Sequence, residues 1–154
     1  MCMTFKFIRH TEAMKWLVKS TEINERYKPT NHKYIPRGRV VNVNYGENIG
    51  YEKNLVRPSI VVSVDSSNQS SGNVIVVPLT KKENKTKDGR PFKLLKSQYL
   101  LLMANYTGLT YDSIVQCEDM RVVSKARLGN LLDTVSEDDM NEINKRLSYI
   151  LDLK

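Results

Sequence analysis

The chain has 154 residues, of which 27% are charged and 40% hydrophobic, and its formal net charge is +7. This length suits one domain with its own core, and the positive charge favours polyanionic partners. No apolar run approaches the ~20 residues that a membrane span requires, and the first ten residues lack a signal-peptide core. The two cysteines, Cys2 and Cys117, show neither metal-ligand spacing nor a disulfide framework. We therefore expect a cytoplasmic protein that binds no membrane, metal or other cofactor.

Residues 1–35 are expected to form a helical extension that packs on a domain comprising residues 36–154. Within the extension, residues 11–27 have a moderately amphipathic pattern that Pro29 ends. Trp16 is the only tryptophan, and we interpret it as part of the packing rather than as a platform for base stacking. The apolar residues expected on the packed side are Met14, Leu17, Val18 and Ile23.

Three runs after this extension are typical of β-strands. Residues 39–45 partly alternate between polar and apolar types, as in a half-buried strand, and a polar loop with two glycines follows. Residues 57–64 and 73–80 are rich in Val and Ile, with a turn-rich stretch between them. This pattern predicts a β-hairpin with a rather long loop.

The register of this hairpin brings a cation and a hydroxyl together. If Val64 pairs with Val74, antiparallel geometry places Arg57 opposite Thr80 or one residue away. Facing residues in such a pair have Cβ atoms about 4.5–5.5 Å apart. Arg57 and Thr80 would thus meet at the open end of the hairpin, where such a pair can hold a phosphate.

A basic segment follows directly after Thr80. Its position beside the expected phosphate site favours electrostatic guidance of a nucleic acid, although most charge runs are solvated loops and this alternative stays open. Between residues 81 and 96 the net charge is +5, from Lys81, Lys82, Lys85, Lys87, Arg90, Lys93 and Lys96 against Glu83 and Asp88.

The remaining pattern completes a small, mostly antiparallel sheet with a terminal helix. Residues 94–103 suit a strand or a short helix, residues 112–124 suit one strand, and residues 125–132 suit a short helix or a helical turn. Ser136 is expected to cap the last helix, which begins with acidic residues. Its apolar residues at helical spacing are Met140, Ile143, Leu147, Ile150 and Leu151.

Several motifs occur in an order and spacing that carry a family resemblance. They are Arg37-Gly38-Arg39-Val40, the stretch from Gly50 to Pro58, Val77-Pro78-Leu79-Thr80, the stretch from Ile114 to Arg121, Lys125-Ala126-Arg127-Leu128 and the helix around Met140 to Leu147. Over roughly residues 36–153 the chain resembles the MazF/PemK family of toxin endoribonucleases. This resemblance implies an α+β, mostly β fold: an SH3-like, partly open barrel of antiparallel strands. It also implies a homodimer and a cognate antitoxin that blocks the RNA groove.

The residues exclude several kinds of catalytic site. His10 and His32 lie before the matched region, and the chain has no Gly-rich phosphate loop, zinc-ligand cluster or Gly-x-Ser-x-Gly elbow. RNA cleavage can proceed without these, because the 2′-hydroxyl is an internal nucleophile and positioning supplies much of the catalysis. Arg57 can bind the scissile phosphate bidentately and Thr80 can add a hydrogen bond. The resemblance points to the same two residues.

Structural roles for these two residues remain as alternatives. Arg57 could form a salt bridge to Glu52 or Glu118, and Thr80 could simply end its strand. In one branch of the family, an arginine and an acid that flank a cysteine serve as acid and base. Here the arginine is replaced by Gln116, whereas the acid is retained as Glu118. This replacement shifts the weight of catalysis to Arg57 and Thr80.

The proposed catalytic set is therefore Arg57, Thr80 and Glu118. Glu118 is expected either to act as base or to orient Arg57, and the second role is favoured. Arg121 is expected to contact substrate or to form an ion pair at the core edge, and Cys117 to be a small buried residue. The candidate RNA-binding residues are Glu52, Lys53, Gln116, Arg121, Lys81, Lys82, Lys85, Lys87 and Arg90.

The function that these observations favour is that of a toxin in a toxin–antitoxin system. The resemblance implies a metal-independent, sequence-selective endoribonuclease that leaves a 2′,3′-cyclic phosphate and a 5′-hydroxyl. The expected partners are single-stranded RNA, a cognate antitoxin, a second copy of the chain, and DNA for the toxin–antitoxin complex. Two alternatives are a non-enzymatic toxin of the CcdB type, against which Arg57 and Thr80 argue, and a catalytically silent nucleic-acid-binding module, which Gln116 keeps open.

Overall fold

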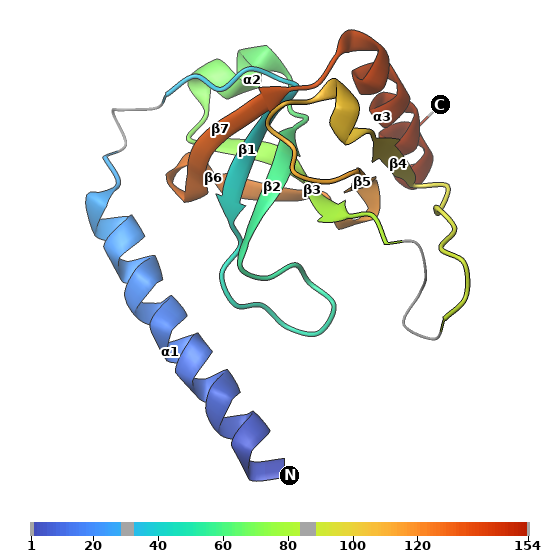
Figure 1. Cartoon of the computed structure of the whole chain (residues 1–154). Coiled ribbons are helices and arrows are strands. Elements are labelled where there is room, and N and C mark those ends of the chain that lie inside the picture. The colour runs from blue at the N-terminus through green and yellow to red at the C-terminus, as the bar shows by residue number, and fades with distance from the viewer. Residues whose placement is uncertain (1, 29–32, 84–88, 154) are drawn as a thin grey trace.

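A computed structural model describes residues 2–28, 33–83 and 89–153, with side chains from residue 10 onward (Figure 1). Short 3₁₀ turns lie at Met103–Asn105 (η1), Cys117–Asp119 (η2) and Lys125–Arg127 (η3). The helices and strands are α1 (Cys2–Arg26), β1 (Arg39–Asn44), β2 (Val56–Val61), α2 (Asp65–Ser70), β3 (Asn73–Lys81), β4 (Gln98–Leu101), β5 (Ser113–Gln116), β6 (Arg121–Ser124), β7 (Leu128–Thr134) and α3 (Glu137–Ile150).

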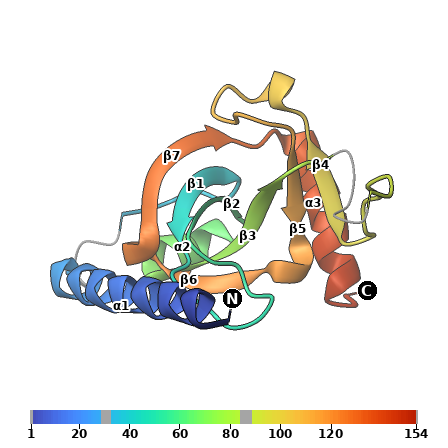
Figure 2. The same ribbon diagram turned by 60° about the horizontal axis from the view of Figure 1, so that its bottom comes forward.

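The described residues form a seven-stranded antiparallel sheet that curls on itself (Figure 2). The strand order is β4-β5-β3-β2-β1-β7, and β6 pairs with β3 outside this path. Within the described residues, no pairing joins the end strands β4 and β7, so the barrel is not closed. The predicted antiparallel sheet with helices at both ends of the chain is confirmed.

Apolar side chains alternate between the two faces of the central strands and build two cores. The core beneath α3 contains Val40, Ile60, Val77 and Cys117, together with Met140, Ile143 and Leu147 of the helix. The core on the opposite face contains Val41, Val43, Tyr45, Val61, Val74, Val76 and Val123. Cys117 is 1% exposed and burial raises its pKa to about 12, so the prediction of a small buried residue is confirmed.

The C-terminal helix begins as predicted. The Ser136 side chain accepts a hydrogen bond from the backbone N–H of Asp139, which satisfies one of the free donors at the helix start. The first turn holds Glu137, Asp138 and Asp139, where the helix dipole favours negative charge.

Two predicted elements differ from the structure, and a third agrees with it in part. The stretch 65–72 contains the short helix α2, in which buried Asn68 hydrogen-bonds both the hydroxyl and the carbonyl of Ser63. Residues 112–124 form two strands, because a 3₁₀ turn at Cys117–Asp119 separates β5 from β6. Residues 125–132 begin with the 3₁₀ turn Lys125–Arg127, which confirms a helical turn there, but the rest of the segment belongs to β7, which pairs with β1. The ambiguous segment 94–103 contains the strand β4.

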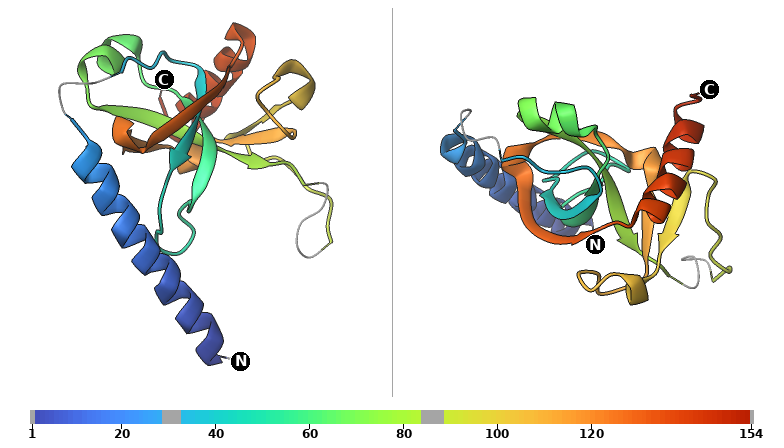
Figure 3. Two further views of the ribbon diagram at one scale, coloured as in Figure 1. Left: turned by 60° about the vertical axis from the view of Figure 1, so that its left-hand side comes forward. Right: turned by 90° about the horizontal axis from the view of Figure 1, so that it is seen from above.

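The N-terminal helix begins at Cys2 rather than at residue 11, and its N-terminal half extends beyond the domain (Figure 3). The expected packed side is wrong for Met14, Leu17 and Val18, which are all more than 60% exposed, whereas Ile23 is half-buried and faces the domain as expected. The helix instead faces Ser124, Ala126 and Arg127 with a stripe at helical spacing that consists of Trp16, Ser20, Ile23 and Tyr27. In the described part of the chain, no helix is long and apolar enough to cross a membrane.

Candidate active site

The two strands of the predicted hairpin separate into a fork. Strands β2 and β3 pair at Ser59↔Pro78, Ile60↔Val77 and Val61↔Val76. Beyond these pairs, β2 continues against β1 while β3 turns to β5. Because proline has no N–H to donate, Pro58 and Pro78 limit how far the ladder between the strands can extend.

A cavity of about 390 Å³ lies at this fork, and we call it the fork pocket. Continuing the observed register places Arg57 opposite Thr80, and both residues line the pocket, so the structure brings together the two residues that the hairpin register paired. The lining residues are Asn42, Val56, Arg57, Pro58, Leu79, Thr80, Lys81, Gly108, Leu109, Thr110, Tyr111, Ser113 and Leu132.

The guanidinium of Arg57 is anchored on one side only. Its Nε donates a hydrogen bond to the backbone carbonyl of Asn54 at 2.9 Å. Among the described residues, no hydrogen bond or ion pair engages its two terminal nitrogens, so the salt bridges to Glu52 or Glu118 are not formed. Arg57 is half-buried, and its two terminal amino groups remain available to a ligand.

The charges of two arginines, Arg57 and Arg121, act on buried Tyr45. The buried Tyr45 hydroxyl shares a hydrogen bond with Ser59 at 2.9 Å, and the guanidinium carbon of Arg121 lies 5.8 Å from the centroid of the Tyr45 ring. Burial raises the pKa of Tyr45, while the Ser59 hydrogen bond and the charges of Arg121 and Arg57 oppose that rise. The two cations therefore act on the same tyrosine from different neighbouring positions.

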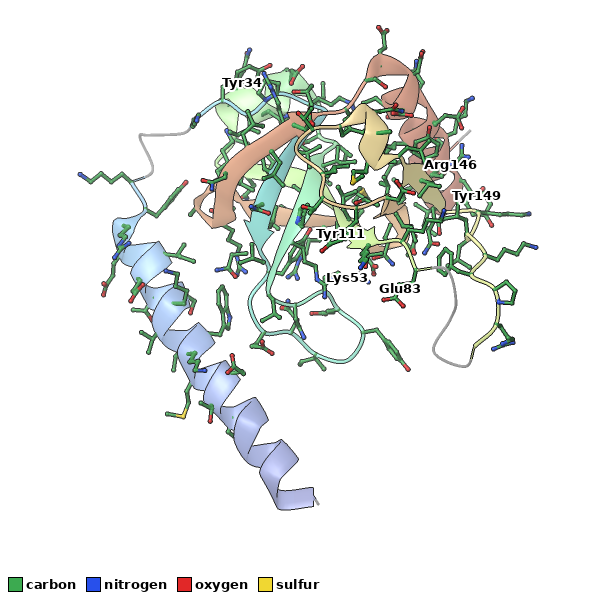
Figure 4. The ribbon with its side chains drawn as sticks, in the orientation of Figure 1. Tyr34, Lys53, Glu83, Tyr111, Arg146 and Tyr149 are labelled. Carbon is green, nitrogen blue, oxygen red and sulfur yellow. The ribbon has the colours of Figure 1, made fainter. Side chains whose placement is uncertain are left out.

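A second cavity, of about 300 Å³, lies at the loop between β1 and β2, and we call it the loop pocket. Lys53 on this loop forms an ion pair with Asp119 at 3.0 Å. Figure 4 labels Lys53 on the same side of the domain as Tyr111. The lining residues are Tyr45, Glu52, Lys53, Glu118, Asp119, Met120 and Arg121.

Glu118 belongs to the loop pocket and not to the fork pocket. Its carboxylate accepts hydrogen bonds from Ser97 Oγ at 2.8 Å and from Gln98 Nε2 at 2.5 Å. In the described residues nothing joins it to Arg57, so the expectation that Glu118 orients Arg57 by direct contact is wrong. The reason is that the 3₁₀ turn after β5 directs Glu118 toward β4.

Gln116 and Arg121 occupy different surroundings. Gln116 lines neither pocket, faces Gln98 across the β4–β5 pair, and buries a side-chain oxygen that has no hydrogen-bond partner in the described chain. Arg121 stacks near Tyr45 and lines the loop pocket. No ion pair of Arg121 exists among the described residues, which leaves its guanidinium to the pocket.

The basic segment leaves from the edge of the fork pocket. Lys81 lines this pocket, and its Nζ lies 4.2 Å from the centroid of the Tyr111 ring. Lys82 is half-buried, and its backbone N–H donates to the Asp112 carbonyl at 2.8 Å. Arg90 is exposed. The predicted RNA-binding residues Lys85 and Lys87 lie outside the described residues.

Sequence reasoning missed the groups that hold the predicted residues in place. Asn54 holds Arg57 through its main chain, so its residue type carries no signal. Ser97 and Gln98 hold Glu118 across the β4–β5 pair, a proximity that only the tertiary fold creates. Across the residues that the structure describes, no group of three or more His, Cys, Asp or Glu side chains could hold a metal ion.

The fold is that of solved MazF proteins and related endoribonucleases. A solved MazF from Deinococcus radiodurans superposes with a TM-score of 0.63 and 20% identity, covering 79% of this chain and 99% of that chain. A mycobacterial endoribonuclease solved in complex with its cognate antitoxin gives a TM-score of 0.56 and 22% identity, covering 78% of this chain and 97% of that chain. At these identities the likeness establishes the fold.

The sequence comparisons establish the family. Residues 36–151 match the model of the PemK-like, MazF-like toxins of type II toxin–antitoxin systems. An endoribonuclease MazF from Staphylococcus saprophyticus is 31% identical over 104 residues, which cover 68% of this chain and 80% of that protein. The chain therefore belongs to the PemK-like, MazF-like toxin family, and is a MazF-like toxin endoribonuclease.

Proposed function

We propose that this toxin cleaves single-stranded RNA at the fork pocket, with Arg57 and Thr80 on the scissile phosphate. The observation that carries the proposal is the meeting of these two residues in one cavity, with two guanidinium amino groups of Arg57 unengaged. A planar guanidinium fits two oxygens of a phosphate, and a threonine hydroxyl can donate to a third. The chemistry that such a site supports is phosphoryl transfer within the RNA strand.

In the proposed reaction, the 2′-hydroxyl attacks the adjacent phosphorus and the bond to the 5′ oxygen breaks. The products are a 2′,3′-cyclic phosphate and a 5′-hydroxyl: the 2′ proton leaves to solvent or a base, and the departing 5′ oxygen takes up a proton from solvent or an acid. Negative charge builds on the non-bridging oxygens in the transition state, where Arg57 and Thr80 would donate hydrogen bonds. No step needs a metal ion, so cleavage should persist in EDTA.

The loop pocket would bind a nucleotide next to the scissile phosphate. Lys53 and Arg121 supply positive charge there, and the carboxylates of Glu52 and Glu118 can accept hydrogen bonds from base amino groups. We assign Glu118 to this contact rather than to Arg57, because Ser97 and Gln98 hold it in the loop pocket. Sequence selectivity would then arise beside the cleavage site.

The backbone of the RNA would continue along the basic segment. Lys81 lines the fork pocket and Lys82 follows it, and we propose that these residues, together with Arg90, Lys85 and Lys87, contact phosphates. Such contacts add affinity without sequence information. Gln116, which lines neither pocket, would contribute only indirectly.

The proposed partners follow from the same surface. One similar structure is an endoribonuclease in complex with its cognate antitoxin. We propose that an antitoxin with an acidic, partly apolar segment covers the basic surface and competes with RNA, folding as it binds. The active form would be a homodimer, and the toxin–antitoxin complex would bind DNA.

The deciding experiment is cleavage of a mixed RNA pool by purified protein in excess EDTA, with sequencing of the new 5′ ends. We expect ends that share a short sequence and carry a 5′-hydroxyl, with no cleavage by the Arg57→Ala variant. Full activity of that variant would contradict the proposed site. Absence of cleavage by the wild-type protein would favour a non-enzymatic toxin or a silent binding module, and activity that returns only with a divalent ion would contradict metal independence.

A further inference from the structure

The N-terminal helix contacts the domain where the β1–β2 loop begins. A Cβ atom at Gly46 would lie 2.2 Å from Cε2 and 2.4 Å from Cζ2 of Trp16, so the indole rests directly on the backbone of Gly46. Gly46 has a φ of +79°, which also favours glycine. A side chain at this position would have to displace the indole.

Arg127 fixes the same indole from the domain side. Its guanidinium carbon lies 5.1 Å from the centroid of the Trp16 ring. Its Nη1 donates hydrogen bonds to the backbone carbonyls of Asn44 at 3.3 Å and Tyr45 at 3.1 Å. These are the last residue of β1 and the first residue of the loop. Trp16 and Arg127 therefore contact each other, and both contact the start of the β1–β2 loop.

The loop transmits this contact to the fork pocket. The Tyr45 carbonyl also accepts from Asn48 Nδ2 at 3.1 Å, and the backbone N–H of Asn48 donates to Asn54 Oδ1 at 2.7 Å. The carbonyl of Asn54 in turn accepts from Arg57 Nε at 2.9 Å. The backbone of Gly46 and Leu55 closes the loop neck with a hydrogen bond of 2.8 Å. Continuous contacts thus run from Trp16 to Arg57.

We propose that Trp16 is a positioning residue for cleavage: the N-terminal helix holds the β1–β2 loop so that Arg57 and Lys53 face the RNA in fixed geometry. This inference rests on the proposed function of the fork pocket. The family match begins at residue 36, so the helix that carries Trp16 lies outside it. The helix would therefore be an addition that tunes the catalytic loop of this particular chain.

The test compares Trp16→Ala with Leu17→Ala. Leu17 is the neighbouring residue on the same helix and is 66% exposed, so its truncation matches the loss of a large side chain without touching the loop. A misplaced phosphate-binding group can cost up to about 10²-fold in rate even when the change is distant, so we expect kcat of Trp16→Ala to fall by about 10–10²-fold. KM should change little, and Leu17→Ala should behave as wild type.

A second measurement is independent of RNA cleavage. Hydrogen exchange of residues 46–55 should accelerate in Trp16→Ala and not in Leu17→Ala, and Trp16→Phe should restore much of both the protection and the rate. Unchanged exchange in Trp16→Ala would overturn the proposal, and so would faster exchange with an unchanged kcat. An inactive wild-type protein would instead contradict the proposed function, and exchange would still decide whether Trp16 holds the loop.

Discussion

Replacement of Arg57 by lysine tests how the fork pocket would use its cation. The guanidinium of Arg57 has two tasks in the proposed site: Nε bonds the Asn54 carbonyl, and the two terminal nitrogens bond phosphate. Lysine keeps the charge, but a single ammonium cannot reproduce the planar pair of donors while also bonding a fixed carbonyl. Arg57→Lys should therefore retain RNA binding and lose much of the rate.

The magnitude follows from the number of donors that each variant removes. A hydrogen bond to a charged group contributes about 1.5–3 kcal/mol. Arg57→Ala removes two such bonds to phosphate, about 3–6 kcal/mol, which corresponds to a decrease in kcat of about 10²–10⁴-fold. Arg57→Lys removes one, so its kcat should decrease by about 10–10²-fold.

The assay is single-turnover cleavage of a short RNA in EDTA, with KM from the concentration dependence and thermal unfolding to verify folding. Arg39→Lys is the matched control, because Arg39 also lies on a strand of the sheet and donates to the Thr134 hydroxyl, away from both pockets. A kcat of Arg57→Lys within twofold of wild type would refute bidentate binding. An effect of both Arg57 variants on KM alone would show that Arg57 binds RNA without assisting the transition state.

Three further outcomes are expected. Replacing Lys81 and Lys82 by glutamine should reduce the slope of log affinity against log salt by about 0.7 for each phosphate that is no longer neutralised, and an unchanged slope would assign these residues to a solvated loop. The Tyr99 hydroxyl donates to Asp139, and this hydrogen bond raises the pKa of Tyr99 to about 12. The hydrogen bond therefore stabilises the folded protein fully below pH 10, and this contribution disappears as the pH rises towards 12. In denaturant unfolding, Tyr99→Phe should thus lower the free energy of unfolding by about 1 kcal/mol at pH 8 and by progressively less above pH 10. An equal loss at pH 8 and above pH 10 would contradict this expectation. Ser136→Ala should destabilise by about 1 kcal/mol and lower Tm by about 2–4 °C, and an unaltered Tm would show that the cap contributes nothing.

The sequence pattern within each segment predicted those features of the site that arise from strands adjacent in the sequence. The Val-rich runs defined the β2–β3 pair, and its register placed Arg57 near Thr80. The cap at Ser136 was equally local. By contrast, the break between β5 and β6 depends on β3, whose two ends need different partners.

Tertiary contacts determined what local pattern left open. The apolar pattern of the first helix suggested burial of Met14 and Leu17, yet the helix is fixed by Trp16 against a glycine thirty residues later. The partners of Glu118, Ser97 and Gln98, lie just before and at the start of β4, a segment that the pattern could not distinguish from a helix. Such contacts between distant segments carry no local periodicity.

The two residues that we propose to bind phosphate, Arg57 and Thr80, lie on strands that are held to the sheet to different degrees. The long strand β3 pairs with β6 over its first part, with β2 in its middle and with β5 at its end, where Thr80 lies. Thr80 could move away only if β3, which pairs with three other strands, separated from its partners. Arg57 lies where β2 pairs with β1 but no longer with β3. It is next to the β1–β2 loop, which Trp16 of α1 contacts at Gly46. In the proposed site, Thr80 would thus be held rigidly while the position of Arg57 could adjust. Changes in substrate preference should therefore arise more readily on the side of Arg57.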